Sequence, residues 1–358
     1  VDLDEAESLG EPVVGFLGYD YAARLEPTVP LPEKGPDLPE SRFVVADTLV
    51  RFDHVSGIAE VLCGDAGEVE DMLEAPLGAI PTGTGVAGPL QRMPSRYEYE
   101  RIVSVAKDHI KQGDAFQIVL SQRAERPTSA SAVQLYRSLR RVNPSPYLFL
   151  LELEDLALVG SSPETLVKAE GRRASVNPIA GTTRSGEGDA ERLLRSEKDR
   201  AEHVMLVDLG RNDLSRVCVP GSVHVERFLE AERFSHVTHL VSEVVGDLNE
   251  DVSHFDLLRA CFPAGTVSGA PKVRAMQIIS ELEGHRRGTF AGAVGYFLPG
   301  EAFDTCIAIR TILLKDGVAY LQAGAGIVAE SDPQSEQQEC LNKLAAVETA
   351  IRLAEARS

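Results

Sequence analysis

Two pairs of acidic residues, Asp199 with Glu202 and Glu336 with Glu339, have the spacing of a metal site. The members of each pair are three residues apart in a segment with a helical pattern, so their carboxylates share one helical face. Like charges placed in this way repel each other by about 0.2–0.5 kcal/mol unless a cation lies between them. Solvated pairs of this kind are common on acidic proteins, so the surroundings of each pair decide whether the two converge on one hard cation.

The second pair follows a glycine-rich segment, QAGAGIVAESDPQSEQQE, at residues 322–339. Val318–Gln322 predicts a strand, and Gly324-Ala325-Gly326 is expected to form a turn that brings bare backbone to the surface. The same letters match the dinucleotide pattern GxGxxG/A. No second strand follows to carry a ribose-binding acid, which excludes that function.

A helix is predicted after this turn. Asp332 fits the helix cap and Pro333 fits the first helical turn. Glu336, Glu339 and Lys343 then lie on one side of the helix, with apolar residues on the other. Backbone N–H groups, a cation and a lysine gathered in one place would bind a carboxylate.

The first pair lies in SEKDRAEHVMLVDLGRNDLSR, which also predicts a helix. Ser196 and Asp199 fit a capping box, which is the ordinary role for that aspartate. Glu202 has no such role, and most of the following residues of its helix are apolar. An unpaired carboxylate buried among them would be costly, and binding a metal would remove that cost.

Three further side chains are candidates for chemistry. His239 lies in a strand-like stretch, where a lone histidine is more often a satisfied core residue. Glu164 in GSSPE could cap a helix, or could serve as an acid or base at the end of a strand. Arg310 lies within CIAIRTILL, expected as one apolar strand, and a guanidinium buried there should face a carboxylate. The loops PIAGTTRSG and FPAGTVSGAPK are rich in small residues and resemble anion cradles.

The composition excludes several classes of protein. The formal net charge of −19 argues against a nucleic-acid partner. No apolar run is long enough to span a membrane, and no export signal is visible. Five scattered cysteines without a CxxC pattern suggest reduced cytoplasmic thiols and no structural zinc. Only 8 of the 36 basic residues are lysine, so the acid-rich, lysine-poor balance favours adaptation to concentrated salt, although a GC-rich genome also replaces lysine by arginine.

The pattern predicts an α+β fold, with antiparallel sheets packed face to face and helices outside. Residues 1–94 are expected as a partial N-terminal subdomain and linker, and residues 95–358 as the catalytic domain. A helix starts at the capping box Ser95–Glu98. The expected strands are Val13–Leu17, Phe43–Phe52, Ile58–Leu62, Ala115–Gln122 with Phe116, Ile118 and Leu120 on one face, Tyr147–Leu153, Leu156–Val159, Gly292–Phe297 and Thr305–Leu314.

Ten ordered motifs together resemble the chorismate-utilising enzymes, and most closely the component I subunits of anthranilate synthases. They are GDAFQIVLSQR, NPSPYLF, GSSPE, PIAGT, AEHVMLVDLGRNDL, HVTHLVS, FPAGTVSGAPK, AGAVGYF, DTCIAIRT and QAGAGIVAESDPQSEQQE. The likeness runs from about Ser95 to the end of the chain, and before it only GFLGYDYAARLEP matches.

The resemblance implies a role for each matching position. Glu202 and Glu339 match magnesium ligands, with Asp199 and Glu336 beside them in the same site, and the magnesium would hold the ring carboxylate of chorismate. The positions that match chorismate-binding residues are Gly181, Thr182, Arg310, Gly324, Ala325 and Gly326, with Lys343 assisting.

Three matches concern the reaction. Glu164 matches the general acid that helps the ring hydroxyl leave, and His239 the group needed when pyruvate is eliminated. Gln117 stands where the water-adding isochorismate synthases carry a lysine base. A neutral side chain there suits ammonia, which needs no base to become a nucleophile. The resemblance also implies a separate glutamine amidotransferase subunit as the source of ammonia, because no glutaminase pattern is present here.

Two departures qualify the resemblance. Phe290 replaces a tyrosine that usually contacts the substrate, so its hydroxyl contact is lost. Asn143–Tyr147 matches one half of the family's tryptophan site, with Pro146, Tyr147 and Leu148 as the contact positions, but its N-terminal half has no match here, which puts feedback inhibition in doubt.

Two alternatives to an anthranilate-forming enzyme remain open at this point. The first is aminodeoxychorismate synthase component I, which aminates a different ring carbon. Ala180 favours anthranilate, because many of those enzymes have a nucleophilic lysine at this position, although some have alanine. The second is a chorismate-binding subunit without activity, which the filled catalytic positions argue against.

Overall fold

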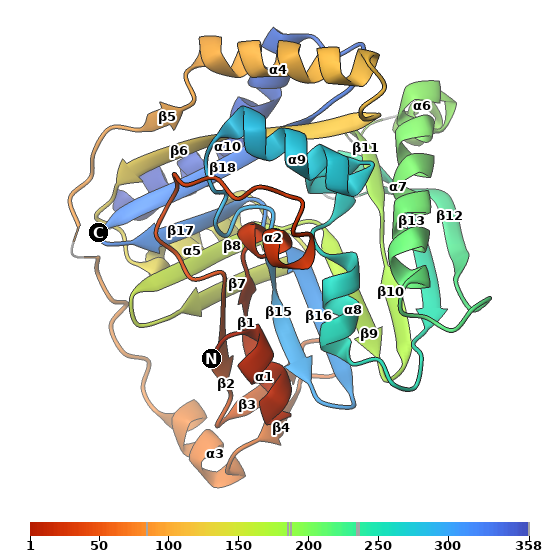
Figure 1. Ribbon diagram of the computed structural model, residues 1–358. Helices are drawn as coiled ribbons and strands as arrows, with labels where there is room; N and C mark the ends of the chain where they lie inside the picture. Colours follow the sequence, from red (N-terminus) through yellow and green to blue (C-terminus); the bar gives the residue numbers. More distant parts are fainter. Residues whose placement is uncertain (84, 185, 187, 234–236, 357–358) are drawn as a thin grey trace.

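The computed structural model describes residues 1–83, 85–184, 186, 188–233 and 237–356. Two antiparallel sheets form its centre, with helices on their outer sides (Figure 1). The helices are α1 (Leu3–Leu9), α2 (Ala22–Leu25), α3 (Ala66–Glu74), α4 (Arg96–Lys111), α5 (Ala132–Val142), α6 (Asp189–Arg195), α7 (Glu197–Ser215), α8 (His254–Cys261), α9 (Lys272–Glu283) and α10 (Pro333–Glu355), with 3-10 turns η1 (Tyr19–Tyr21) and η2 (Gly265–Val267).

The strands are β1 (Val13–Leu17), β2 (Ser41–Val45), β3 (Leu49–Asp53), β4 (Ile58–Cys63), β5 (Gln91–Met93), β6 (Gln117–Pro127), β7 (Tyr147–Glu152), β8 (Leu156–Ser162), β9 (Thr165–Glu170), β10 (Arg173–Val176), β11 (Ile179–Arg184), β12 (His224–Arg233), β13 (Val237–Asp247), β14 (Gly269–Ala270), β15 (Ala293–Leu298), β16 (Ala302–Ile307), β17 (Thr311–Lys315) and β18 (Val318–Ile327). Within the described ranges, the larger sheet has nine strands in the order β11-β13-β10-β9-β16-β15-β1-β2, with β12 beside β13. The smaller has seven in the order β14-β6-β18-β17-β8-β7, with β5 beside β6.

The two sheets pack face to face through an apolar layer to which both contribute. Phe16 and Val294 come from the larger sheet, and Leu158 and Leu313 come from the smaller one, each at most 5% exposed. Burying one side chain of this size contributes about 1.5–3 kcal/mol to stability. This layer and the antiparallel pairing of the strands confirm the predicted α+β fold class.

Helices cover the outer faces of both sheets (Figure 1). Helices α7 and α8 pack on the larger sheet, while α4, α5 and α10 pack on the smaller one. Helix α4 begins at the predicted capping box, since the Ser95 hydroxyl accepts a hydrogen bond from the backbone N–H of Glu98 and the Glu98 carboxylate accepts one from the backbone N–H of Ser95. Asp332 caps α10 and Pro333 begins it, as predicted.

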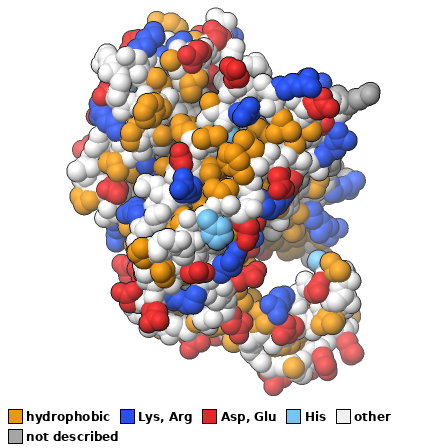
Figure 2. Space-filling model, turned by 90° about the vertical axis from the view of Figure 1, so that its right-hand side faces the viewer, with side chains coloured by type: hydrophobic (Ala, Val, Ile, Leu, Met, Phe, Trp, Pro, Cys, Tyr) orange, Lys and Arg blue, Asp and Glu red, His pale blue; other side chains and the backbone are white. Residues whose placement is uncertain are grey.

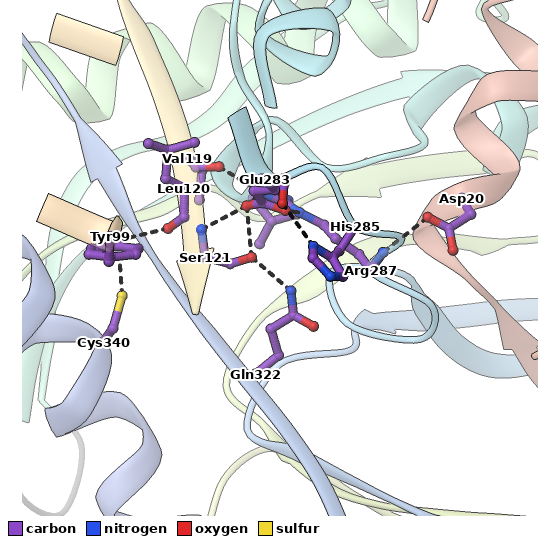
Figure 3. A network of polar contacts seen from close by, with 11 residues as sticks. Asp20, Tyr99, Val119, Leu120, Ser121, Glu283, His285, Arg287, Gln322 and Cys340 are labelled. Carbon is purple, nitrogen blue, oxygen red and sulfur yellow. Dashed lines mark hydrogen bonds and ion pairs between the residues drawn. The ribbon is translucent and has the colours of Figure 1, made fainter. Parts of the chain in front are cut away.

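A buried ion pair ties α9 to the smaller sheet and to the N-terminal segment (Figure 3). Arg287, 4% exposed, pairs with Glu283 at 2.7 Å between Nη2 and Oε1. The same carboxylate oxygen accepts from the backbone and hydroxyl of Ser121, and Asp20 accepts from the backbone of Arg287. The ring of Tyr19 lies under the guanidinium at 4.5 Å. A buried charge of this kind needs all of its partners, because leaving one unpaired is costly.

One expected turn and three expected strands differ from the structure. Gly324-Ala325-Gly326 is not a turn, because β18 runs through all three residues and pairs with β6 along its whole length. The expected strand Thr305–Leu314 divides into β16 and β17, which belong to different sheets. Phe43–Phe52 divides in the same way into β2 and β3. Phe116, predicted to share a buried face with Ile118, is 72% exposed because β6 begins one residue later.

The first 94 residues do not stand together as one block. Strands β1 and β2 close one end of the larger sheet, and β5 pairs with β6 of the smaller one. The β3–β4 hairpin forms a sheet of its own, with α3 following it in sequence (Figure 1). The division at residue 94 stays a prediction, and the structure adds that both sheets draw strands from before it.

No helix in the described ranges is long and apolar enough to cross a membrane. All five cysteines lie in the described part and are free thiols, four of them buried. Figure 2 shows acidic and basic side chains interspersed over one face of the molecule.

Candidate functional site

Glu164 lies in the short connection between β8 and β9, where the two sheets meet. Its backbone is held on both sides, since its N–H donates to the Ser162 hydroxyl at 3.3 Å and its carbonyl accepts from Ile307 at 3.0 Å. The alternative that Glu164 caps a helix is wrong, because strands flank it. Burial raises the pKa of the Glu164 carboxyl to about 7, although the Thr266 hydroxyl and the charges of Arg310 and Lys343 each lower it. A carboxyl with this pKa can hold and give up a proton near neutral pH.

Arg310 lies at the break between β16 and β17, outside any strand. Its φ of 49° is rare for a residue with a side chain, and its carbonyl accepts from the backbone of Ser161 at 3.2 Å. Burial lowers the pKa of Arg310 and the charge of Glu164 raises it, but a guanidinium stays charged at any working pH. The expectation that Arg310 faces a carboxylate agrees with this coupling, although the expected apolar strand around it does not exist.

His239 lies on β13 beside a bulge in the neighbouring β11. The register of the two strands shifts between Ala180 and Thr182, and Gly181 within the bulge has φ 68°. The Nδ1 atom of His239 lies 3.1 Å from the Gly181 carbonyl, which can only accept, so Nδ1 carries the hydrogen. Burial, with a smaller contribution from Arg310, lowers the pKa of His239 against the opposing effect of that bond. The ring is therefore neutral at pH 7, with Nε2 as its basic nitrogen.

The same bulge brings β11 against the first acidic pair. A Cβ on Gly181 would lie 3.2 Å from the Cβ of Asp199, so the backbone passes very close to helix α7 at this point. The Ser196 hydroxyl accepts from the Asp199 backbone at 3.3 Å, which confirms Ser196 as the helix cap. The other half of the predicted capping box is wrong, because the Ser196 N–H donates to the Arg192 carbonyl at 3.0 Å rather than to the Asp199 carboxylate. Thr182 pairs with His239 in the strand register, and its side chain lies outside what the structure describes.

Gln117 connects the first acidic pair to the glycine-rich strand. Its side-chain Nε2 donates to Oε1 of Glu202 at 3.1 Å. A Cβ on Gly326 would lie only 2.5 Å from that nitrogen, so the amide passes directly over the glycine. Gln117 is 4% exposed. Glu202 is therefore not an unpaired carboxylate, and its partner comes from β6.

Lys343 connects the second acidic pair to the same strand. Its Nζ lies 2.8 Å from Oε1 of Glu339 and donates to the Gly324 carbonyl at 2.7 Å. Ala325, between the two glycines, is fully buried. Glu336, one turn earlier on α10, is half-buried. Strand β18 is thus contacted by Gln117, which bonds to Glu202 of α7, and by Lys343 of α10.

The four carboxylates suit a magnesium ion only if the substrate shares in its coordination. In the described ranges, no three His, Cys, Asp or Glu side chains lie close enough to hold a metal by themselves. Magnesium commonly takes one or two carboxylates and fills its other positions with water and substrate oxygens. Asp199 and Glu202 on α7 and Glu336 and Glu339 on α10 supply hard oxygen donors. This donor set fits magnesium.

Two groups of predicted residues lie outside this cluster of contacts. Phe290 is 8% exposed and packs under the Arg287 guanidinium at 5.6 Å from its ring centre. Tyr147 on β7 bridges the two sheets, with its hydroxyl 2.8 Å from Thr165 Oγ1 and 2.9 Å from Asp304 Oδ1. Pro146 is exposed and Leu148 half-buried beside it. Their expected roles toward substrate and tryptophan stay predictions.

Sequence reasoning missed Thr266. Its loop resembled an anion cradle, but the threonine itself was not singled out. The structure places its hydroxyl close enough to the Glu164 carboxyl to lower the pKa of that group. A hydroxyl between glycine and valine, in a loop otherwise made of small and apolar residues, was the available signal.

Comparison with known proteins identifies one family. The sequence profile of the chorismate binding enzymes matches residues 2–349, well before the boundary expected at Ser95. Anthranilate synthase component 1 of Streptomyces coelicolor is 46% identical over 96% of this chain and 73% of its own length. The Saccharomyces cerevisiae protein of the same name is 43% identical over 96% of this chain and 73% of its own length. The crystal structure of anthranilate synthase component I from Streptococcus pneumoniae has a TM-score of 0.85 and 39% identity, covering 94% of this chain and 80% of that one.

Proposed function

The chain belongs to the family of chorismate binding enzymes. We propose that it acts as component I of an anthranilate synthase, which converts chorismate and ammonia to anthranilate and pyruvate. The chemistry depends on Glu164, which lies where the two sheets meet, in the field of two cations, Arg310 and Lys343, and whose pKa burial raises to about 7. The cations attract the carboxylates of chorismate, and the carboxyl is poised to give a proton.

Amination begins at the ring. Ammonia forms a bond to a ring carbon while the hydroxyl leaves with its bonding electron pair, and Glu164 gives that hydroxyl a proton so that water departs. Gln117 stays neutral beside Glu202 and offers no base that would activate water in competition. Ala180 has no amine, so the enzyme makes no covalent bond to the substrate.

Pyruvate loss then restores the aromatic ring. His239 is neutral, and its Nδ1–H bond to Gly181 leaves Nε2 as the basic atom that takes the ring proton. Electrons from that C–H bond enter the ring as the bond to the enolpyruvyl oxygen breaks, and pyruvate leaves after gaining a proton.

A magnesium ion, held by Glu202 and Glu339 with Asp199 and Glu336 beside them, would supply positive charge at the ring carboxylate. Support for it is the hard oxygen donor set on α7 and α10. Ammonia would come from a glutamine amidotransferase subunit, which the naming of the relatives as component 1 favours.

The decisive experiment identifies the product. Purified chain, chorismate, magnesium and an ammonium salt at high pH are expected to give ortho-aminobenzoate and pyruvate, separated by chromatography and detected by fluorescence. If aminodeoxychorismate were the sole stable product, the chain would instead be an aminodeoxychorismate synthase component I. No turnover at all, from a folded chain that binds chorismate, would favour a subunit without activity.

A further inference from the structure

The turn that carries Glu164 is held on both sides by one segment of the chain, residues 143–147. This segment follows helix α5 and runs into strand β7 of the smaller sheet. The turn leaves the same sheet at the end of β8 and enters the larger sheet at Thr165, the first residue of β9. Tyr147 pairs with Ser162 in the register of β7 and β8. The segment is therefore placed to contact residues before and after Glu164.

The contact before Glu164 joins Asn143 to Ser161. The side-chain Nδ2 of Asn143 donates to the Ser161 hydroxyl at 3.3 Å and to the Ser161 carbonyl at 3.4 Å, and the hydroxyl donates to the Asn143 carbonyl. Ser161 is fully buried. Its backbone N–H donates to the Arg310 carbonyl at 3.2 Å. Asn143 thus holds a residue that is also bonded to Arg310, one of the two cations that lower the pKa of Glu164.

The contact after Glu164 joins Tyr147 to Thr165. The Tyr147 hydroxyl lies 2.8 Å from Thr165 Oγ1 and donates to Asp304 Oδ1 at 2.9 Å, a bond that lowers the pKa of Asp304 and so favours its ionised form. A phenol has one hydrogen and an ionised carboxylate only accepts, so the Thr165 hydroxyl donates to the Tyr147 oxygen. The residue next to Glu164 is thereby bonded across the two sheets.

An acid in this turn needs such support. Glu164 is only half-buried, and its connection passes from one sheet to the other, so a shift between the sheets would move its carboxyl. A proton donor must lie within about 2.6–3.2 Å of the oxygen that it protonates. Catalytic groups are held to about 0.5 Å by hydrogen bonds from the residues around them. One bond on each side of Glu164, both from a single segment, fits that requirement.

We propose that Asn143 and Tyr147 are positioning residues for Glu164, which hold its turn at Ser161 and at Thr165 and keep the carboxyl within reach of the leaving hydroxyl. Both act through Glu164, so the inference rests on the proposed role of that residue as the acid. It concerns turnover without any effector, and it is separate from the contacts with tryptophan expected of the same segment.

Variants at Thr165 test the contact after Glu164. Thr165→Val removes the hydroxyl but leaves the bond from Tyr147 to Asp304 in place. It should lower kcat by about tenfold, a part of the roughly 10²–10⁴-fold that a positioned acid contributes, with the KM for chorismate unchanged. Thr165→Ser keeps the hydroxyl and should turn over at nearly the wild-type rate. Tyr147→Phe should lower kcat like Thr165→Val, and combining the two should have little further effect, since both remove the same bond.

The loss should be confined to amination. Asn143→Ala, which frees the turn before Glu164, should slow the consumption of chorismate at saturation by a similar factor. When the aminated, non-aromatic intermediate is supplied instead of chorismate, Asn143→Ala and Thr165→Val should release pyruvate at the wild-type rate. That half of the proposed reaction depends on His239 and not on Glu164.

The chain offers a matched control in the same pair of strands. Thr305 on β16 is 2% exposed, and its hydroxyl donates to the Val167 carbonyl on β9 at 2.7 Å. Thr305→Val removes this bond without touching the turn, and it should leave both halves of the reaction unchanged. If Tyr147→Phe does not fold because Asp304 loses its partner, the comparison of Thr165→Val with Thr165→Ser carries the test.

The outcomes separate the positioning role from the acid itself. Glu164→Gln should abolish turnover, and if it does not, the proposed acid is wrong. With Glu164→Gln inactive, amination at the wild-type rate in Thr165→Val would overturn the role of Tyr147, and the same result in Asn143→Ala would overturn that of Asn143. An equal loss in both halves of the reaction would also overturn the proposal, because it would indicate general damage to the site.

Discussion

The side-chain amide of Gln117 donates a hydrogen bond to Glu202, with Nε2 and Oε1 3.1 Å apart, directly over the bare Cα of Gly326. Three elements far apart in sequence, β6, α7 and β18, meet in this contact. The amide keeps Glu202 oriented toward the strand that also accepts the bond from Lys343, at Gly324. The absence of a side chain at position 326 is what allows it.

Gly326→Ala should disturb this contact without unfolding the chain. The new methyl group would lie 2.5 Å from Gln117 Nε2, which is the end of a flexible side chain and can move aside. We expect kcat/KM for chorismate to fall by about tenfold, equivalent to the loss of one hydrogen bond to a charged group, with an unchanged melting temperature.

A double-mutant cycle checks the reason. If Gly326 acts through Gln117, adding Gly326→Ala to a Gln117→Ala variant should have little further effect, because the amide is already gone. Fully additive losses in the double variant would show that the methyl group harms the site in another way.

The activity should depend on the protonated form of Glu164. Its pKa of about 7 predicts that kcat/KM for chorismate, corrected for free ammonia, falls tenfold per pH unit above that value. Removing the positive charge of Arg310 by Arg310→Gln should shift the break upward, because Arg310 lowers the pKa of Glu164. A pH profile that is flat from pH 6 to 9 would contradict the assignment.

Ionisation of Glu164 should also make the stability of the folded chain depend on pH. Burial raises the pKa of Glu164 in the folded chain above that of the unfolded chain, so folding binds a proton between about pH 4.3 and 7. The stability contributed by this group is therefore highest at low pH and falls as pH rises through that window. Glu164→Gln should raise the melting temperature at pH 8 and leave it unchanged near pH 4.5. An equal shift at both pH values would show that ionisation is not the cause.

The parts of the fold set by local signals could be predicted from sequence. Ser95 and Asp332 cap their helices where expected, because a capping side chain bonds to backbone only three residues away. Pairs of strands joined by short turns, such as β7 with β8, were predicted for the same reason.

The errors in the fold share a non-local origin. Gly324 and Gly326 suggested a turn, but they lie in a strand where a Cβ at 324 would be 2.9 Å from the Leu120 carbonyl. Arg310 suggested a strand interior, but the chain must leave one sheet for the other there and takes a positive φ to do so. Both outcomes depend on a neighbour that is distant in sequence.

The site shows the same limit. The residue types and their helical spacing predicted a set of candidate groups, while the contacts that those groups make could not be predicted. Neither the bond from Gln117 to Glu202 nor the position of Thr266 beside Glu164 follows from spacing along the chain.

Magnesium should be required for turnover. Glu202→Gln or Glu339→Gln should reduce activity by at least about a hundredfold, since a hard cation prefers charged oxygen ligands. Magnesium binding to the chain with chorismate present, followed by isothermal calorimetry, should weaken in parallel. Glu348→Gln, on the same helix as Glu339 and paired with Arg92, is the control that should change neither. Full activity in excess chelator would refute the requirement.

His239→Ala should separate the two halves of the reaction. Amination needs Glu164 but not the base, so an aminated, non-aromatic intermediate should accumulate while pyruvate release slows by about 10²–10⁴-fold. Single-turnover mixing with lactate dehydrogenase as the pyruvate sensor measures the second half directly. Thr238→Val, its neighbour on β13, tests general damage to the strand. Release of aromatic product at the normal rate from His239→Ala would reduce this residue to a core histidine.

Concentrated salt should stabilise the chain. The net charge of −19 makes the folded state repel itself, and added ions shorten the screening length from about 10 Å at 0.1 M to about 3 Å at 1 M. We expect the melting temperature at pH 7.5 to rise steadily between 0.05 M and 2 M potassium chloride. Near the isoelectric point of about 4.9 the repulsion disappears, so the same salt series should have little effect there. A rise of equal size at both pH values would point to general salting-out of apolar surface rather than to charge screening. A flat or falling melting temperature at pH 7.5 would contradict salt adaptation. A GC-rich genome would then explain the scarcity of lysine.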